Sequence, residues 1–120
     1  MHRIDIDDPE VDADYAHRLL YHGELFTGEA EEFVAGRRLS LTTYREGIKD
    51  GPYRQWYASG VLQAEGVMRT GRLAGEARRW HENGVLAQRL VQSEDGRFSL
   101  QAFEWDENGA PTRTWDRDKA

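Results

Sequence analysis

The sequence contains no cysteine and no long uninterrupted apolar run. The absence of cysteine excludes disulfide bonds and thiolate chemistry. The absence of a long apolar run excludes a membrane-spanning helix, and the opening stretch MHRIDIDDPE lacks the apolar segment of a secretory signal. These absences lead us to expect a reducing, cytoplasmic location.

Positive charge is scarce at the start of the chain. Residues 1–14 have a net charge of −5 and the whole chain has −6, which leaves −1 for residues 15–120. The acidic residues of this arm are Asp5, Asp7, Asp8, Glu10, Asp12 and Asp14. The arm is either a solvated, partly disordered tail or a contact surface for a basic partner. A third alternative is that it belongs to the sheet and pairs with an edge strand through Ile4, Ile6 and Val11. Nucleic acid and anionic membranes are poor partners, because carboxylates repel phosphates.

Three markers recur along the chain with a period of about 24 residues. The first is an aromatic residue, found at Phe33, Trp56, Trp80 and Trp105. The second is a turn glycine, found at Gly36, Gly60, Gly84 and Gly109. The third is a leading glycine five residues before an aromatic, found at Gly28, Gly51 and Gly75. A sequence that repeats three markers at one period is a repeat protein with about four units.

The period favours β-hairpins over helical pairs, because two short strands and two turns fill about 24 residues. We therefore predict an all-β protein: an antiparallel meander of successive hairpins in an elongated, single-layer, twisted sheet. The predicted repeat domain spans residues 15–116, between the acidic arm (1–14) and a charged tail (117–120). Strands are expected near 15–22, 29–34, 38–46, 52–58, 61–69, 76–81, 85–92, 99–105 and 111–116.

Loop length decides the register of each hairpin. A two-residue loop at Asn83-Gly84 pairs Trp80 with Ala87 and His81 with Leu86. The equivalent loop one unit earlier pairs Trp56 with Gln63, Tyr57 with Leu62, and Arg54 with Glu65. The tryptophans would then share one face with Arg54, Arg78 and Phe103, opposite Tyr53, Tyr57, Ala64, Ala77, Leu86 and Leu90. A longer loop shifts the pairing by one residue, and both registers remain open.

The units over residues 47–91 resemble the MORN-variant repeat, (D/N)-G-x-x-x-x-(W/Y)-(Y/H)-x-(N/S)-G-x-L. The resemblance is weaker over 21–46, and over 97–115, where Leu100 replaces the leading glycine. It implies a ribbon of hairpins. It also implies a bacterial context, since similar proteins include YwqK-like antitoxins and immunity proteins found beside secreted toxins. Eukaryotic MORN repeats, by comparison, act as scaffolds and have been linked to membrane lipids.

No pattern in the sequence supports catalysis, a cofactor or a metal site. His17 and His22 are five residues apart in an expected strand, which would point them to opposite faces. The repeated aromatics are either packing residues or an exposed platform. We therefore expect a binding protein and not an enzyme. The candidate partner-binding residues are Trp56, Tyr57, Trp80, His81, Trp105, Asp5, Asp7, Asp8, Glu10, Asp12 and Asp14.

The first functional hypothesis is an antitoxin or immunity protein that blocks a bacterial toxin sterically and electrostatically, without a cofactor. The acidic arm would attract a basic toxin domain such as a nuclease. The second hypothesis is a structural scaffold without a toxin partner. Such a scaffold would assemble through the edge strands of the meander into a homo-oligomer.

Overall fold

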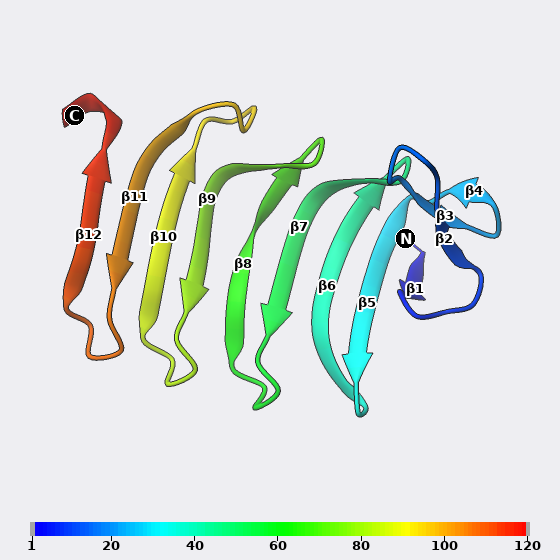
Figure 1. Cartoon of the computed structure of the whole chain (residues 1–120), viewed down its shortest axis with the longest axis horizontal. Helices are drawn as coiled ribbons and strands as arrows, with labels where there is room; N and C mark the ends of the chain where they lie inside the picture. Colours follow the sequence, from blue (N-terminus) through cyan, green and yellow to red (C-terminus); the bar gives the residue numbers. More distant parts are fainter. Residues whose placement is uncertain (1, 120) are drawn as a thin grey trace.

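The computed structural model describes residues 2–119, which form one long sheet and one small sheet (Figure 1). The long sheet has nine strands, in the order β1 (Arg3–Asp5), β5 (Gly28–Val34), β6 (Arg37–Arg45), β7 (Ile48–Trp56), β8 (Leu62–Arg69), β9 (Arg72–Trp80), β10 (Leu86–Gln92), β11 (Ser99–Trp105) and β12 (Pro111–Asp116). The small sheet contains β2 (Val11–Ala13), β3 (Leu19–Tyr21) and β4 (Glu24–Leu25). A 3-10 turn, η1 (Arg117–Lys119), follows β12.

The predicted all-β meander is confirmed. From β5 to β12 each strand pairs antiparallel with the next strand in sequence, so the chain forms a twisted ribbon (Figure 1). The molecule measures 47 × 33 × 24 Å along its principal axes. No helix within residues 2–119 is long and apolar enough to cross a membrane.

The strand expected over 15–22 is wrong. Only Leu19–Tyr21 is extended, and it belongs to the small sheet. His17 and His22 have positive φ values of 63° and 51°, which break an extended chain on either side of β3. The carboxylate of Asp14 also accepts hydrogen bonds from the backbone N–H groups of Ala16 and Arg18, and so closes a turn where a strand was expected.

The amino-terminal arm is part of the fold, and its interpretation as a solvated tail is wrong. Strand β1 pairs in parallel with β5, placing Ile4 opposite Ala30. Ile4 is only 6% exposed and packs in a cluster with Leu19, Phe26 and Ala30. The arm is acidic, but it also carries apolar residues, and burial of Ile4 together with strand pairing attaches it to the edge of the sheet.

Two kinds of turn alternate with the strands. Two-residue turns join strands at Ala35-Gly36, Glu46-Gly47 and Thr70-Gly71, with positive φ at both residues. This is the turn that matches the twist of a hairpin. At the turns predicted from Gly60, Gly84 and Gly109 the loop has three residues (58–60, 82–84 and 107–109), and only the glycine has positive φ.

The three-residue loops change the register at the tryptophans. The Gly84 N–H donates to the His81 carbonyl (2.9 Å), and His81 N–H donates to the Val85 carbonyl (2.8 Å). Trp80 therefore lies opposite Leu86, and not opposite Ala87 as expected. The equivalent expectations of Trp56 opposite Gln63 and Tyr57 opposite Leu62 are wrong for the same reason, because Trp56 lies opposite Leu62.

A β-bulge follows each of these shifted pairs and restores the predicted register deeper in the hairpin. Arg54 lies opposite Glu65 and Arg79 opposite Gln88, as two-residue loops would place them. The bulge inserts one extra residue on the returning strand, which compensates for the extra residue in the loop.

The buried residues divide into two groups. At the amino-terminal end, Ile4, Leu19, Phe26 and Ala30 form the one sizeable cluster within residues 2–119, with Ile6, Val11, Tyr21 and Tyr44 packed against it. Along the ribbon, the buried residues are alanines: Ala64, Ala74, Ala77 and Ala102. The ribbon is therefore a single layer, in which small side chains are covered by their larger neighbours on the same face.

Candidate protein-binding face

Cross-strand pairing divides the ribbon into two faces, because residues directly opposite each other project to the same side. One side, the aromatic face, carries Phe33, Trp56, Trp80, Phe103 and Trp105. The other side, the alanine face, carries Tyr53, Ala64, Ala77, Leu90 and Ala102. The predicted grouping of the tryptophans with Arg54, Arg78 and Phe103 is thus confirmed. Leu86 is a correction, because the three-residue loop places it opposite Trp80, and not opposite His81, on the aromatic face.

The aromatic side chains are half-buried. The rings of Phe103 and Trp105 stack with centroids 6.1 Å apart. The guanidinium of Arg38 lies over the Trp56 ring, 4.7 Å from its centroid, and that of Arg89 lies 5.6 Å from the Phe103 ring centroid. The rings of Trp56, Phe103 and Trp105 are therefore held by neighbouring side chains, and all five rings of the face remain partly exposed.

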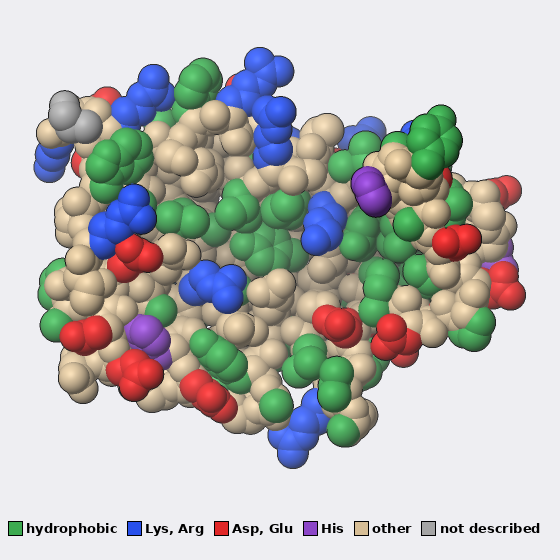
Figure 2. Space-filling view, viewed as in Figure 1, with side chains coloured by type: hydrophobic (Ala, Val, Ile, Leu, Met, Phe, Trp, Pro, Cys, Tyr) green, Lys and Arg blue, Asp and Glu red, His purple; other side chains and the backbone are tan. Residues whose placement is uncertain are grey.

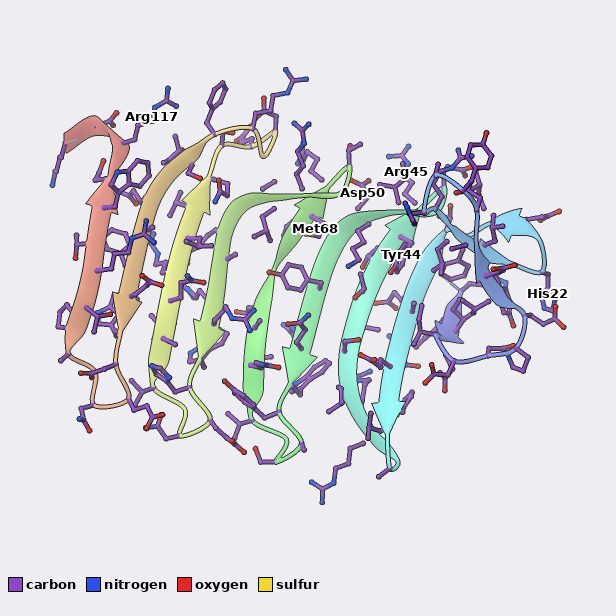
Figure 3. The ribbon with its side chains drawn as sticks, viewed as in Figure 1. His22, Tyr44, Arg45, Asp50, Met68 and Arg117 are labelled. Carbon is purple, nitrogen blue, oxygen red and sulfur yellow. The ribbon has the colours of Figure 1, made fainter. Side chains whose placement is uncertain are left out.

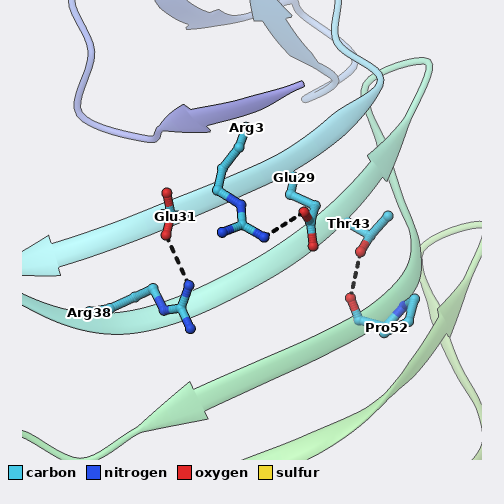
Figure 4. Close-up of polar contacts among 6 residues, drawn as sticks. All are labelled: Arg3, Glu29, Glu31, Arg38, Thr43 and Pro52. Carbon is cyan, nitrogen blue, oxygen red and sulfur yellow. Dashed lines mark hydrogen bonds and ion pairs between the residues drawn. The ribbon is translucent and has the colours of Figure 1, made fainter. Parts of the chain in front are cut away.

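Five arginines on the aromatic face are each paired with a glutamate, and Figure 4 shows two of these pairs. The pairs are Arg3–Glu29 (2.9 Å), Arg38–Glu31 (3.0 Å), Arg54–Glu65 (3.5 Å), Arg89–Glu76 (3.2 Å) and Arg78–Glu76. Thr43 adds a hydrogen bond to the Pro52 carbonyl (2.7 Å) beside them (Figure 4). These contacts hold long side chains in defined positions around the aromatic rings.

Glu76 is the centre of this charge network. Arg78 and Arg89 lie directly opposite each other in the β9–β10 pair. Two like charges in that position repel each other, and the Glu76 carboxylate between them offsets the repulsion. Its hydrogen bond from Arg89, with the nearby charges of Arg89 and Arg78, lowers the pKa of Glu76. An open depression beside it is lined by Pro52, Tyr53, Arg54, Glu65, Gly66, Val67, Glu76 and Arg78.

Tyr57 and His81, two of the candidate binding residues, connect neighbouring repeats. The Tyr57 hydroxyl donates to the Trp80 carbonyl (2.7 Å), and the His81 Nε2 lies 2.8 Å from the Trp105 carbonyl. Asn83 makes a similar contact with the Glu107 carbonyl (2.9 Å). The repeat position that is Tyr57 in one unit and His81 in the next therefore holds a side chain that makes a polar contact with a backbone carbonyl of the following repeat.

The structure places the acidic candidates at the amino-terminal end of the ribbon, away from most of the aromatic row. Asp14 is bound to Arg18 (2.8 Å), and the pKa of Asp14 is lowered, mainly by the hydrogen bond from the Arg18 backbone. Asp8 accepts from the Tyr21 hydroxyl (3.4 Å), and Glu10 lies 3.3 Å from His22. Asp12 accepts a hydrogen bond from the Ala13 backbone. Asp5 lies opposite Glu31 in β1, at the end of the aromatic face, and Asp7 is exposed beside it.

Sequence reasoning did not single out Arg38, Glu31, Glu76 or Arg89. Arg38 reaches the aromatic face only because a bulge between Glu32 and Phe33 shifts the β5–β6 register. Arg89 could have been found, because it stands one repeat after Glu65 and so lies opposite Arg78, just as Glu65 lies opposite Arg54. Two arginines in that position call for a carboxylate nearby, which Glu76 supplies. Within residues 2–119, no three His, Asp or Glu side chains converge as a metal-ligand set would.

The two long edges of the ribbon differ in charge (Figure 2). Figure 2 shows Lys and Arg along the upper edge, where the turns carry Arg45, Arg69, Arg72 and Arg97. Asp and Glu predominate along the lower edge, where the turns carry Glu82, Asp106 and Glu107.

No family model, curated protein or solved structure matches the chain. The resemblance to MORN-variant repeats accordingly stays a prediction.

Proposed function

We propose that this chain is a protein-binding module that uses its aromatic face, and that it is an antitoxin or immunity protein neutralising a bacterial toxin. The observation that supports this proposal best is the row of half-buried aromatic rings among fixed arginines on one side of a single-layer sheet. Tyrosine, tryptophan and arginine are the residues that contribute most at protein interfaces. Because ion pairs already order these arginines, binding would cost less conformational entropy.

The proposed mechanism is occlusion of the toxin surface and requires no cofactor. The acidic end of the ribbon, with Asp5 and Asp7 exposed, would attract a basic domain such as a nuclease and raise the association rate. The cytoplasm is the proposed site of action, where an immunity protein meets a toxin before or after its transport. Such a protein would bind its toxin through the broad, preformed surface of the sheet and would not insert a single loop into a substrate cleft.

The first test is whether a neighbouring gene encodes a secreted protein with a toxin domain, and the second is co-expression of the chain with that domain. We expect the chain to restore growth, and the purified pair to bind in titration calorimetry. Arg54→Glu, on the aromatic face, should weaken binding by about tenfold or more. The matched control is Arg79→Glu, an equally large charge change at an exposed position on the alanine face. Equal loss in both variants, or no protection by the wild-type chain, would contradict the proposal.

The contribution of the acidic end is tested separately by the double variant Asp5→Asn and Asp7→Asn. Both side chains are exposed, so the melting temperature should stay nearly unchanged. The association rate with a basic partner should fall at low ionic strength, and the difference should shrink as salt is added. A slower rate that persists at all salt concentrations would indicate a contact effect and not steering.

A structural scaffold is the second candidate function. It is favoured by the unequal ends of the ribbon: one end has the three-residue strand β1 near the small sheet, whereas the other ends in the six-residue strand β12 (Figure 1). A scaffold would use that strand to join copies of the chain, without any toxin partner.

A further inference from the structure

The two ends of the ribbon differ in how their edge strands are protected. Strand β1 has three residues and leads directly into the acidic turn that contains Asp7 and Asp8. Strand β12 has six residues, and no strand within residues 2–119 pairs with its outer edge. The η1 turn after β12 contacts β11, and the Arg117 guanidinium lies 5.1 Å from the Phe98 ring centroid (Figure 3 labels Arg117). The end of the described chain therefore folds back over the sheet and leaves the outer edge of β12 uncovered.

Long, uncovered edge strands carry backbone N–H and C=O groups that can pair with another strand. Natural proteins block such edges with short strands, bulges, prolines and charges. β12 carries Pro111 at its first position, a bulge at Thr112 and Arg113 as its one basic residue, so these devices are confined to its first three residues. Its other exposed members are threonines, which favour strands. The edge thus has the features of a pairing surface over the rest of its length.

We propose that β12 pairs antiparallel with β12 of a second copy of this chain, about a two-fold axis through Thr114. In this register Thr114 faces Thr114 of the second copy, Arg113 faces Trp115, and Thr112 faces Asp116. Arg113 and Trp115 share a face of the sheet, as an antiparallel ladder requires, because they lie opposite Glu104 and Ala102 of β11. The pairing places an arginine against an indole twice, so the strand is complementary to itself on that face. Thr112 lies at the bulge of β12, toward the end of the paired segment.

The neighbouring registers are less favourable. An axis through Arg113 puts two arginines directly opposite each other. An axis through Trp115 puts Arg113 opposite Arg117. Like charges directly opposite each other destabilise a strand pair, which leaves the register centred on Thr114.

Arg113 is available for the proposed contact. Its side chain is 59% exposed, and its distance from Glu104 is 3.6 Å, longer than a well-formed ion pair. A two-fold contact uses the same strand of both copies, so it closes after two and gives a dimer. The product is one continuous sheet in which the two aromatic faces point to the same side.

Cysteine cross-linking tests the register, because the chain contains no cysteine and one substitution supplies the sole thiol. Thr114→Cys should form a disulfide-linked dimer under mild oxidation, since residues opposite each other have Cβ atoms about 4.5–5.5 Å apart. The matched control is Thr112→Cys, also exposed on β12. In the proposed dimer the two thiols of this control would be separated by four strand positions, about 13 Å. Equal cross-linking of both variants, or none in Thr114→Cys, would overturn the register.

Sedimentation equilibrium of the cysteine-free chain tests the dimer itself. The expected mass is twice 13.8 kDa at high micromolar concentration. Thr114→Lys, which brings two ammonium groups together at the axis, should raise the dissociation constant by about tenfold or more. Val67→Lys places the same charge at an exposed position of an interior strand and should leave the mass unchanged. A monomer at every concentration, or species that grow beyond a dimer, would refute the proposal.

Discussion

Replacing Gly66 by alanine tests how the alanine face is packed. Gly66 lies opposite Tyr53 in the β7–β8 pair, and a Cβ added to it would lie 2.9 Å from Tyr53 Cε1 and 3.0 Å from its hydroxyl. The same Cβ would lie 3.1 Å from the Cβ of Ala77. The backbone of Gly66 does not have a positive φ, so any cost of the alanine is steric. One methyl group would thus displace the tyrosine ring from the surface of the sheet.

Overpacking of this kind costs about 1–3 kcal/mol of the free energy of unfolding. Urea titration measures that loss directly. A second readout is the tyrosine itself, because burial raises the pKa of Tyr53 against an opposing effect of Arg79. In Gly66→Ala the ring moves toward solvent, and the pKa of Tyr53 should fall back toward its ordinary value, as followed by NMR of the labelled ring.

The variant Tyr53→Ala completes a double-mutant cycle. Removing the ring vacates the space that the new methyl group needs, so Gly66→Ala should be much less destabilising in the Tyr53→Ala background. Gly109→Ala is the control, because nothing lies within 4 Å of its added Cβ and only its φ of +86° disfavours alanine. Its effect should add to that of Tyr53→Ala. An additive cycle for Gly66, or no loss of stability in Gly66→Ala, would refute this account of the packing.

Three further outcomes are expected. Gly84→Val should lower the free energy of unfolding by about 1–3 kcal/mol through backbone strain alone. Gly47→Val should lower the free energy of unfolding further, because its added Cβ also lies 2.9 Å from the Leu19 carbonyl oxygen. Thermal unfolding compares the stabilities of the two variants. Tyr57→Phe should lose about 0.5–1.5 kcal/mol, the worth of one hydrogen bond to the next repeat, measured in urea against wild type. The contacts with Arg89 and Arg78 that lower the pKa of Glu76 stabilise the fold at neutral pH, and this stabilisation should be lost as the pH falls below about 4.3 and through the lowered pKa of the folded state. In melting curves from pH 6 to 3, Glu76→Gln should lack this part of the pH-dependent loss of stability.

The hairpin meander could be predicted from the sequence because its period and its turn glycines act locally. Gly60, Gly84 and Gly109 all have positive φ, which any short hairpin loop with glycine at that position requires. The division into two faces could be predicted because successive residues of a strand point to opposite sides of the sheet. It held for Arg54 and Arg78 because each bulge restores the register that the longer loop disturbs.

The remaining features depend on contacts that no local pattern reveals. The position of Leu86 depends on loop length, and a loop of two or three residues satisfies the same Asn-Gly signal. Arg38 follows a two-residue turn, and no sequence signal marks the bulge between Glu32 and Phe33 that redirects it. The attachment of the amino-terminal arm depends on Ile4 meeting Phe26 and Leu19, which are distant in sequence. Pairing of the arm through Ile4 is one of three alternatives that the sequence allows, and the sequence alone does not decide among them.

The order of strands in the ribbon also sets the expected route of folding. From β5 onward each strand pairs with the next strand in sequence, so the contacts close short loops of chain. Chains with such local contacts lose little entropy per contact formed and fold rapidly. The exception is β1, which must wait for β5, since Ile4 pairs with Ala30 far along the chain. Folding can therefore begin at any central hairpin and propagate outward, and the amino-terminal strand docks as a separate, slower step that requires β5 to be in place.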